Sequence, residues 1–226
     1  MERLDVIAEQ IRRNLEAKDA ARDKALQRSR ELIRYCAHTI RAVHRDELDG
    51  ARELLATARN AARLMVDDLA GFPDLAYAGY TQDALKEFVE ASAVYALIAG
   101  EPLPSPQELN VEDAAYLNGL GEAAGELRRR SLDIIRRGHS SEAERLLEAM
   151  DDIYSILVTM DFPDAITGGL RRTTDLVRGV LERTRGDLTT SVRQQRLQQA
   201  LAEFTRQLGV KEDVGATDLP QEVGEE

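Results

Sequence analysis

Tryptophan is absent from the 226-residue chain, cysteine occurs once, and aromatic residues make up only 4%. A single cysteine excludes an intrachain disulfide, and Cys36 lies in a helical pattern typical of a packed interior residue. None of the three histidines stands at a recognised zinc spacing from a cysteine or a carboxylate, which argues against a zinc site. No histidine follows a glutamate as Glu-x-x-His, which disfavours a di-iron carboxylate bundle.

Long hydrophobic runs are also missing. No apolar segment approaches the roughly 20 residues that cross a bilayer, and the first five residues, Met1–Asp5, are charged rather than signal-like. We therefore expect a cytoplasmic protein without membrane contact. The formal net charge of −11 disfavours nonspecific coating of DNA, although the last residues, Lys211–Glu226, hold six of the acidic residues against one lysine.

The abundant residues are alanine, leucine, arginine and glutamate, which are strong helix formers. Apolar positions recur at helical spacing, and proline or glycine separates the periodic segments. The predicted helices cover residues 4–44, 51–69, 81–99, 112–137, 140–160, 170–185 and 189–208, with Thr81 as an N-cap and Gly186-Asp187 as a break. We predict an all-α fold, a single elongated bundle of about seven antiparallel helices over residues 1–209, followed by a disordered acidic tail over residues 210–226.

Two pairs of glutamates stand out within these helices. Glu87 and Glu90 are spaced i, i+3 at the head of an otherwise apolar stripe, and Glu122 and Glu126 are spaced i, i+4 among glycine and alanine. No lysine or arginine occurs from Glu87 to Leu127. If the two helices pack face to face, four carboxylates converge without a basic partner from this stretch, and a divalent cation would resolve the repulsion.

Ligands that are all oxygens favour Mg²⁺ or Mn²⁺ over zinc. Such a site suits hydrolysis of a phosphodiester, because the cation would lower the pKa of a water and offset the developing charge, while one glutamate acts as general base. The alternative is that the four glutamates lie on solvated helix faces, since these spacings are common in helices.

Basic residues form further clusters. The candidate nucleic-acid contacts are Arg30, Arg34, Arg41, His44, Arg45, Arg128 and Arg129. Arginine suits bidentate phosphate contact, but surface solvation explains such clusters equally well. No RNA-recognition strand motif or GxxG loop is present, so RNA contact is predicted to be electrostatic, with little readout of bases.

Three segments in order resemble the translin family, which comprises translin and its partner, translin-associated factor X. Arg28-Ser-Arg-Glu-Leu-Ile-Arg followed by Ala42-Val-His-Arg resembles the family's N-terminal helical signature. Leu85-Lys-Glu-Phe-Val-Glu-Ala resembles the partner's LQE(F/Y)VEA segment, and Tyr116-Leu-Asn-Gly-Leu-Gly-Glu-Ala-Ala-Gly-Glu-Leu-Arg resembles its YLLGVADLTGEL segment. The resemblance covers residues 22–208 and is to a homologue of prokaryotic or archaeal type.

The resemblance implies the translin fold, a closed octamer-like shell, binding of single-stranded nucleic acid and, in partner-type subunits, Mg²⁺-dependent RNA cleavage inside the shell. Carried over by position, the family's site carboxylates fall on Glu87, Glu90, Glu122 and Glu126. Glu122 replaces an aspartate of the family pattern, which moves the carboxylate by about one carbon–carbon bond.

Two functions stay open at this point. The first is a metal-dependent endoribonuclease that cleaves single-stranded RNA inside a homo-octamer, with Mg²⁺ or Mn²⁺ on the four glutamates. The second is a non-catalytic shell that holds single-stranded RNA or DNA on its arginines. Metal-dependent cleavage distinguishes the first function from the second.

Overall fold

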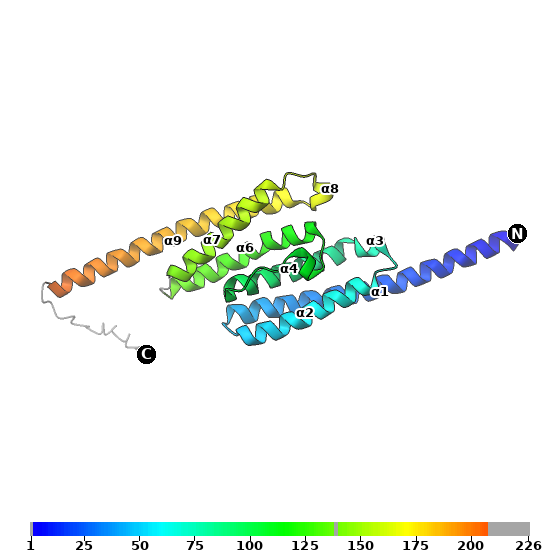
Figure 1. The fold of residues 1–226 in the computed structure, drawn as a ribbon, viewed down its shortest axis with the longest axis horizontal. Coiled ribbons are helices and arrows are strands. Elements are labelled where there is room, and N and C mark those ends of the chain that lie inside the picture. The colour runs from blue at the N-terminus through cyan, green and yellow to red at the C-terminus, as the bar shows by residue number, and fades with distance from the viewer. Residues whose placement is uncertain (1, 138–139, 208–226) are drawn as a thin grey trace, which may run out of the picture.

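The structure is a computed structural model that describes residues 2–137 and 140–207, and its regular elements are all α-helices. The helices are α1 (Glu2–His44), α2 (Leu48–Asp68), α3 (Pro73–Ala76), α4 (Gly79–Ala99), α5 (Pro106–Leu109), α6 (Asp113–Arg136), α7 (Ser140–Thr159), α8 (Asp164–Thr167) and α9 (Leu170–Gln207). Figure 1 shows one elongated bundle, from which the beginning of α1 and the end of α9 extend at opposite ends. The predicted all-α class and bundle are confirmed.

The two central helices are α4 and α6. Helix α4 packs against α1, α2 and α6, while α6 packs against α4, α7 and α9. Phe88, Val89 and Val94 of α4 are at most 1% exposed, and most of the other α4 side chains are also buried. A polar side chain on the face of α4 that meets α1 or α6 is therefore partly withdrawn from water, which raises the free energy of its charged form.

Two glycines bring α6 close to its neighbours. A Cβ on Gly119 would lie 2.7 Å from both the Lys86 carbonyl oxygen and the Val89 Cβ on α4. A Cβ on Gly121 would lie 2.2 Å from the Thr173 Cγ2 on α9. Since these distances are below van der Waals contact, a Cβ at Gly119 would push against the backbone of α4, and a Cβ at Gly121 would displace the Thr173 side chain. This close approach of α6 to α4 brings Glu122 next to the acidic face of α4.

We expect Gly119→Ala to lower the free energy of unfolding by about 1–3 kcal/mol, because the added methyl group overpacks the contact between α4 and α6. Gly125 on the same helix is the matched control, since a Cβ there meets no atom within 4 Å. Gly125→Ala should raise stability by up to about 1 kcal/mol through helix propensity. Urea unfolding of the two variants measures both values, and equal effects would contradict the packing argument.

The described residues contain nine helices rather than about seven, because three short ones, α3, α5 and α8, lie where breaks or loops were predicted, while the last two predicted helices form the single helix α9. Pro73 and Pro106 end the preceding loops but also begin α3 and α5, where proline is favoured in the first helical turn. Ser105 and Glu108 form a reciprocal capping box on α5. The breaks before α3 and α5 were therefore predicted correctly, but the single helical turns that follow them were not predicted.

Two boundary predictions were wrong. Helix α9 runs without a break through Gly186, since one glycine costs a helix only about 1 kcal/mol and buried Leu188 anchors the next turn. Thr81 does not cap α4: the cap is Ala78, and the Thr81 hydroxyl donates to the Leu75 carbonyl oxygen at 2.8 Å. The predicted acidic tail, residues 210–226, lies outside the described residues.

None of the described helices combines sufficient length with sufficient hydropathy to cross a bilayer.

Candidate functional site

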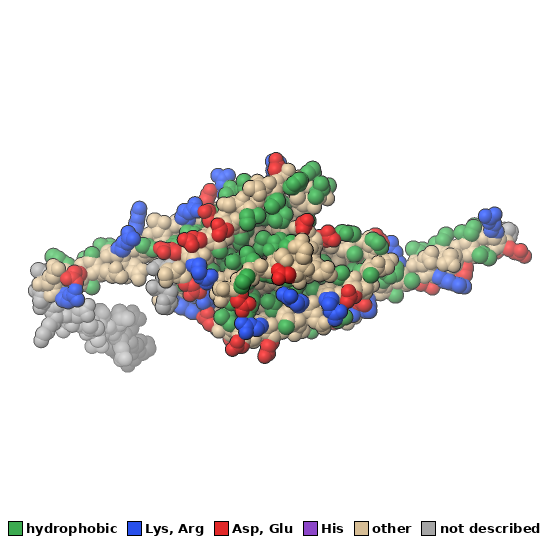
Figure 2. All heavy atoms as spheres, in the orientation of Figure 1, with side chains coloured by type: hydrophobic (Ala, Val, Ile, Leu, Met, Phe, Trp, Pro, Cys, Tyr) green, Lys and Arg blue, Asp and Glu red, His purple; other side chains and the backbone are tan. Residues whose placement is uncertain are grey.

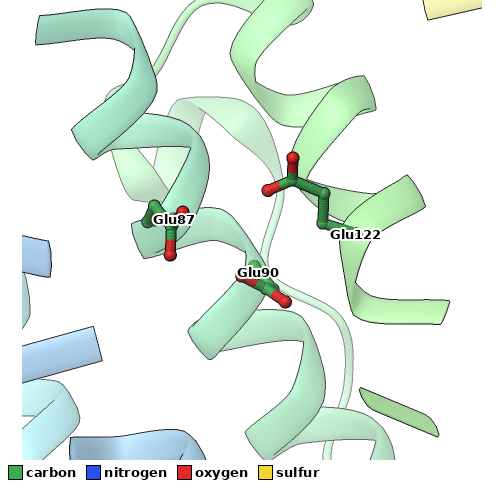
Figure 3. A group of neighbouring side chains, drawn as sticks. All are labelled: Glu87, Glu90 and Glu122. Carbon is green, nitrogen blue, oxygen red and sulfur yellow. The ribbon is translucent and has the colours of Figure 1, made fainter. Parts of the chain in front are cut away.

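Three glutamates from two helices converge between α4 and α6. Glu87 and Glu90 project from α4 and Glu122 projects from α6, and one carboxylate oxygen of each lies within 4.8 Å of the others. Figure 3 shows the side chains directed toward a common space between the two helices. All three residues are half-buried. Three carboxylates at this separation form a donor set that fits a hard divalent cation.

The electrostatics of Glu87 and Glu90 are unfavourable without a cation. Burial, followed by the charges of Glu87, Glu122 and Glu126, raises the pKa of Glu90 to about 8. Burial and the charge of Glu122 likewise raise the pKa of Glu87. Within the described residues, neither carboxylate has an ion pair or a side-chain hydrogen bond. The pair therefore resists ionisation until positive charge arrives.

Cys36 on α1 is fully buried, close enough to Glu87 and Glu90 for their charges to act on its thiol. Burial, together with the charges of Glu87 and Glu90, raises the pKa of its thiol. A thiol that resists ionisation is a poor nucleophile, which agrees with its prediction as a packed interior residue.

Glu122 has a basic partner that the sequence reasoning missed. Lys86 Nζ lies 2.6 Å from Glu122 Oε1. Burial lowers the pKa of Lys86, but the hydrogen bond and the charge of Glu122 outweigh that effect and leave it raised. Lys86 lies one residue before the stretch that lacks basic residues, at the glutamine of the LQE(F/Y)VEA pattern. The lysine in place of this glutamine could have indicated a basic partner for Glu122. The expectation that all four carboxylates lack a basic partner was wrong for Glu122.

Glu126 is also paired, with a residue far away in sequence. The His44 Nε2–H donates to Glu126 Oε2 at 2.5 Å, and Arg129 Nη1 lies 3.6 Å from the same oxygen. The hydrogen bond from His44, set against burial, lowers the pKa of Glu126. The Glu126 carboxylate is therefore not one of the three converging carboxylates, although its charge helps to raise the pKa of Glu90.

Two of the predicted nucleic-acid contacts are turned inward. The His44 side chain is 6% exposed, its Nδ1 has no hydrogen-bond partner among the described residues, and its other nitrogen holds Glu126. Arg128 pairs with Asp187 at 2.9 Å and donates to the Thr184 hydroxyl at 3.0 Å. His44 therefore holds Glu126, and Arg128 links α6 to α9.

The other predicted contacts are exposed. Arg30, Arg34 and Arg41 of α1 follow the spacing i, i+4, i+11, which places them on one face, and the exposed Arg45 directly follows the helix. Arg129 on α6 is also exposed, beside Glu126. These five arginines are the candidate nucleic-acid interface.

A groove reaches Glu122 from outside, while Glu87 and Glu90 are not among the residues that line it. Its volume is about 1080 Å³, and it lies between α4, α6, α8 and the start of α9. Lys86 and Glu122 line it together with Asn118, Arg172 and Thr173. A ligand in this groove therefore reaches the Lys86–Glu122 pair directly.

We expect Lys86→Gln to tighten Mg²⁺ or Mn²⁺ binding by about tenfold, because Glu122 loses its internal cation and gains more from an external one; a change of about 1.4 kcal/mol corresponds to this factor. Titration calorimetry of wild type and variant with Mn²⁺ measures the difference. Lys24→Gln, which removes a distant lysine paired with Asp68, is the control and should leave the affinity unchanged. Weaker binding by Lys86→Gln would contradict the competition.

No protein-family model matches the chain. Over 198 residues the chain is 33% identical to the uncharacterized protein MJ0175 of Methanocaldococcus jannaschii, an alignment that covers 87% of this chain and 86% of that protein.

Among solved structures, the chain is similar to AfC3PO, both alone and in a complex with duplex RNA. Both structures give a TM-score of 0.77 at 34% identity over 81% of this chain. The match covers 96% of the AfC3PO chain in its own crystal structure and 95% in the complex with duplex RNA. NeC3PO without ligand gives a TM-score of 0.75 at 22% identity, over 81% of this chain and 96% of that one, which supports the fold alone. Likeness in sequence and in fold over nearly the whole length of these proteins agrees with the three segments and the helical bundle, and the chain belongs to the translin family, with the C3PO proteins.

Proposed function

We propose that the protein is a metal-dependent endoribonuclease that cleaves single-stranded RNA inside a closed homo-octameric shell. The observation that carries the proposal is the convergence of Glu87, Glu90 and Glu122, two of which have no positive partner among the described residues. Half-buried carboxylates arranged in this way are costly unless a cation binds between them.

The three glutamates would hold Mg²⁺ or Mn²⁺, and the bound cation would act as a Lewis acid toward the phosphodiester and the attacking water. Glu126 would be the fourth site carboxylate. Because His44 fixes its position and lowers its pKa, Glu126 stays ionised at neutral pH and can orient the attacking water by accepting a hydrogen bond.

The exposed arginines support an RNA substrate, since a row of guanidinium groups on α1 matches a phosphate backbone. The similar AfC3PO has been solved with duplex RNA. By that likeness we propose RNA as the ligand of this chain. We keep single strands as the substrate because the resemblance to the family implies binding of single-stranded nucleic acid, and the duplex is a competitor to be tested.

The test is cleavage of a labelled single-stranded RNA by purified protein in Mg²⁺, in Mn²⁺ and in excess chelator, with a duplex of the same sequence in parallel. We expect internal cuts that require the cation and that are faster on the single strand. Absence of cleavage with either cation, while RNA is bound, would reject the nuclease.

The second candidate is a non-catalytic shell that binds single-stranded RNA or DNA. It is favoured by the internal pairing of two site glutamates, Glu122 with Lys86 and Glu126 with His44, which lowers their need for a metal. Tight binding in the absence of cleavage would support it.

Both functions predict that the α1 arginines bind phosphates. For single strands, the slope of log affinity against log salt changes by about 0.7 for each phosphate neutralised. We therefore expect Arg30→Gln/Arg34→Gln to make the slope shallower by about 1.4 in fluorescence anisotropy. Arg178→Gln, which removes an exposed arginine of α9 paired with Glu182, is the control and should keep the wild-type slope. An unchanged slope in the double variant would remove α1 from the interface.

A further inference from the structure

Lys86 lies at the boundary between the converging glutamates and the groove. Its Nζ is 2.6 Å from Glu122 Oε1, and both residues also line the groove. The Lys86 side chain is 23% exposed and the Glu122 side chain 38% exposed, so the ion pair is held at the wall of the groove rather than in bulk water. The ammonium group therefore has the glutamates on one side and a space open to a ligand on the other.

The groove is acidic as long as this ion pair is closed. Five acidic residues line it against two basic ones, and one of the two, Lys86, is already neutralised by Glu122. Figure 2 shows the molecule hollowed between α8 and α3, with acidic side chains at the edge of the hollow. The acidic lining residues are Asp83, Glu112, Asp113, Glu122 and Asp164, and the second basic one is Arg172. A phosphodiester that enters the metal-free groove therefore meets net negative charge, which disfavours its binding.

The Glu122 carboxylate has two competing uses. It belongs to the donor set that fits a divalent cation, and it also holds Lys86. When Glu122 coordinates a cation, its attraction for the Lys86 ammonium falls, and a half-buried ammonium without an anion is costly. Lys86 also lies 4.0 Å from Asp83 Oδ1, but the Asp83 side chain is 70% exposed, and exposed pairs add little stability. The released ammonium therefore needs a new anionic partner in the groove.

We propose that Lys86 is a phosphate-binding residue that Glu122 holds back until Glu122 turns its charge to a divalent cation. The ammonium then moves into the groove on its flexible four-carbon stem and donates to a phosphate oxygen of the RNA strand. The exposed Arg172 lines the same groove and offers a second contact to the RNA backbone.

The consequence is a coupling between the two ligands. RNA binds more tightly when the cation is bound, and by linkage the cation binds more tightly when RNA is bound. The inference rests on the proposed function, because it needs both a cation at the three glutamates and RNA in the groove. It adds to that function a residue that keeps the groove closed to RNA in the metal-free protein.

The first test is a double-mutant cycle in excess chelator, so that no cation takes part. Fluorescence anisotropy with a labelled single-stranded RNA measures the affinities of wild type, Glu122→Gln, Lys86→Gln and the double variant. Because Glu122→Gln frees Lys86 without a cation, we expect it to raise the affinity about tenfold and to steepen the salt slope by about 0.7. In the Lys86→Gln background the same replacement only removes a negative charge and should raise the affinity less than about threefold.

The matched control removes a different charge from the groove. Asp113 lines the groove and is not paired with Lys86, so Asp113→Asn should change the RNA affinity equally with and without Lys86. If Glu122→Gln also gave equal gains in both backgrounds, the gain would come from the lost carboxylate charge alone and the proposal would be overturned.

The second test follows the Lys86 amine in the wild-type protein. Labelling by an amine-specific acylating reagent, measured by mass spectrometry, should rise severalfold at Lys86 when Mn²⁺ saturates the protein, because Nζ leaves Glu122. Lys24, paired with Asp68, is the control and should be labelled equally with and without Mn²⁺. Absence of Mn²⁺ binding in calorimetry would overturn the proposed function and this inference together. Mn²⁺ binding and RNA cleavage with unchanged labelling of Lys86 would overturn the inference alone.

Discussion

Replacing both Glu87 and Glu90 by glutamine is expected to reduce metal-dependent cleavage of single-stranded RNA by at least about 10³-fold. Glutamine keeps the size of each side chain but removes two of the three charges that attract the cation. Loss of Lewis-acid stabilisation costs several kcal/mol, and about 4 kcal/mol already corresponds to a factor of 10³. Single-turnover cleavage in Mg²⁺ and Mn²⁺ measures the effect.

A matched pair of carboxylates is available as the control. Glu144 and Glu148 are exposed on α7 at the spacing i, i+4 and lie outside the site. Glu144→Gln/Glu148→Gln removes the same net charge and should cleave at the wild-type rate. RNA affinity measured in chelator should be equal in all three proteins. Equal cleavage by wild type and by Glu87→Gln/Glu90→Gln would contradict the assignment of the site.

The stability of the metal-free protein is expected to fall as pH rises from 5 to 8. Glu90 has a folded-state pKa of about 8 against an ordinary value of 4.5, so the folded state binds more protons than the unfolded state between these values. The free energy of unfolding therefore decreases through this window and levels off above it. Because Glu90 is only half-buried and solvent screens its charge in part, we expect the free energy of unfolding to decrease by about 2 kcal/mol.

Glu90→Gln should remove most of this pH dependence and be more stable than wild type at pH 8 without metal. Mg²⁺ or Mn²⁺ should stabilise wild type at pH 8 by about 2.7 kcal/mol at a hundredfold excess over its dissociation constant, and much less at pH 5. For a chain of this size that is a rise of about 5–10 °C in Tm. Thermal and urea unfolding at both pH values provide the measurement, and an identical pH slope in wild type and Glu90→Gln would contradict the account.

The helical class and the two acidic faces could be predicted because they depend on local spacing. The periodic stripes placed the long helices, and the spacings of Glu87 with Glu90 and of Glu122 with Glu126 placed each pair on one face. Gly119, one of the small residues near Glu122, is the point where α6 approaches α4 closely.

What the sequence did not reveal depends on contacts between distant residues. Nothing local to Glu126 indicates His44, which lies 82 positions away in the chain and reaches it because α1 packs against α4, the neighbour of α6. Lys86 was not predicted as a partner of Glu122 because it lies one residue before the stretch without basic residues, which begins at Glu87. Gly186 was given too much weight as a break, since the cost of one glycine is smaller than the gain from packing α9 against α6 and α7.

Binding of a divalent cation by Glu87, Glu90 and Glu122 together can be seen in crystals grown with Mn²⁺, with data collected for anomalous scattering. We expect an anomalous peak about 2.0–2.3 Å from a carboxylate oxygen of each of the three residues, and loss of that peak in Glu87→Gln/Glu90→Gln. No peak at this position in fully Mn²⁺-loaded wild-type crystals would contradict binding at this site.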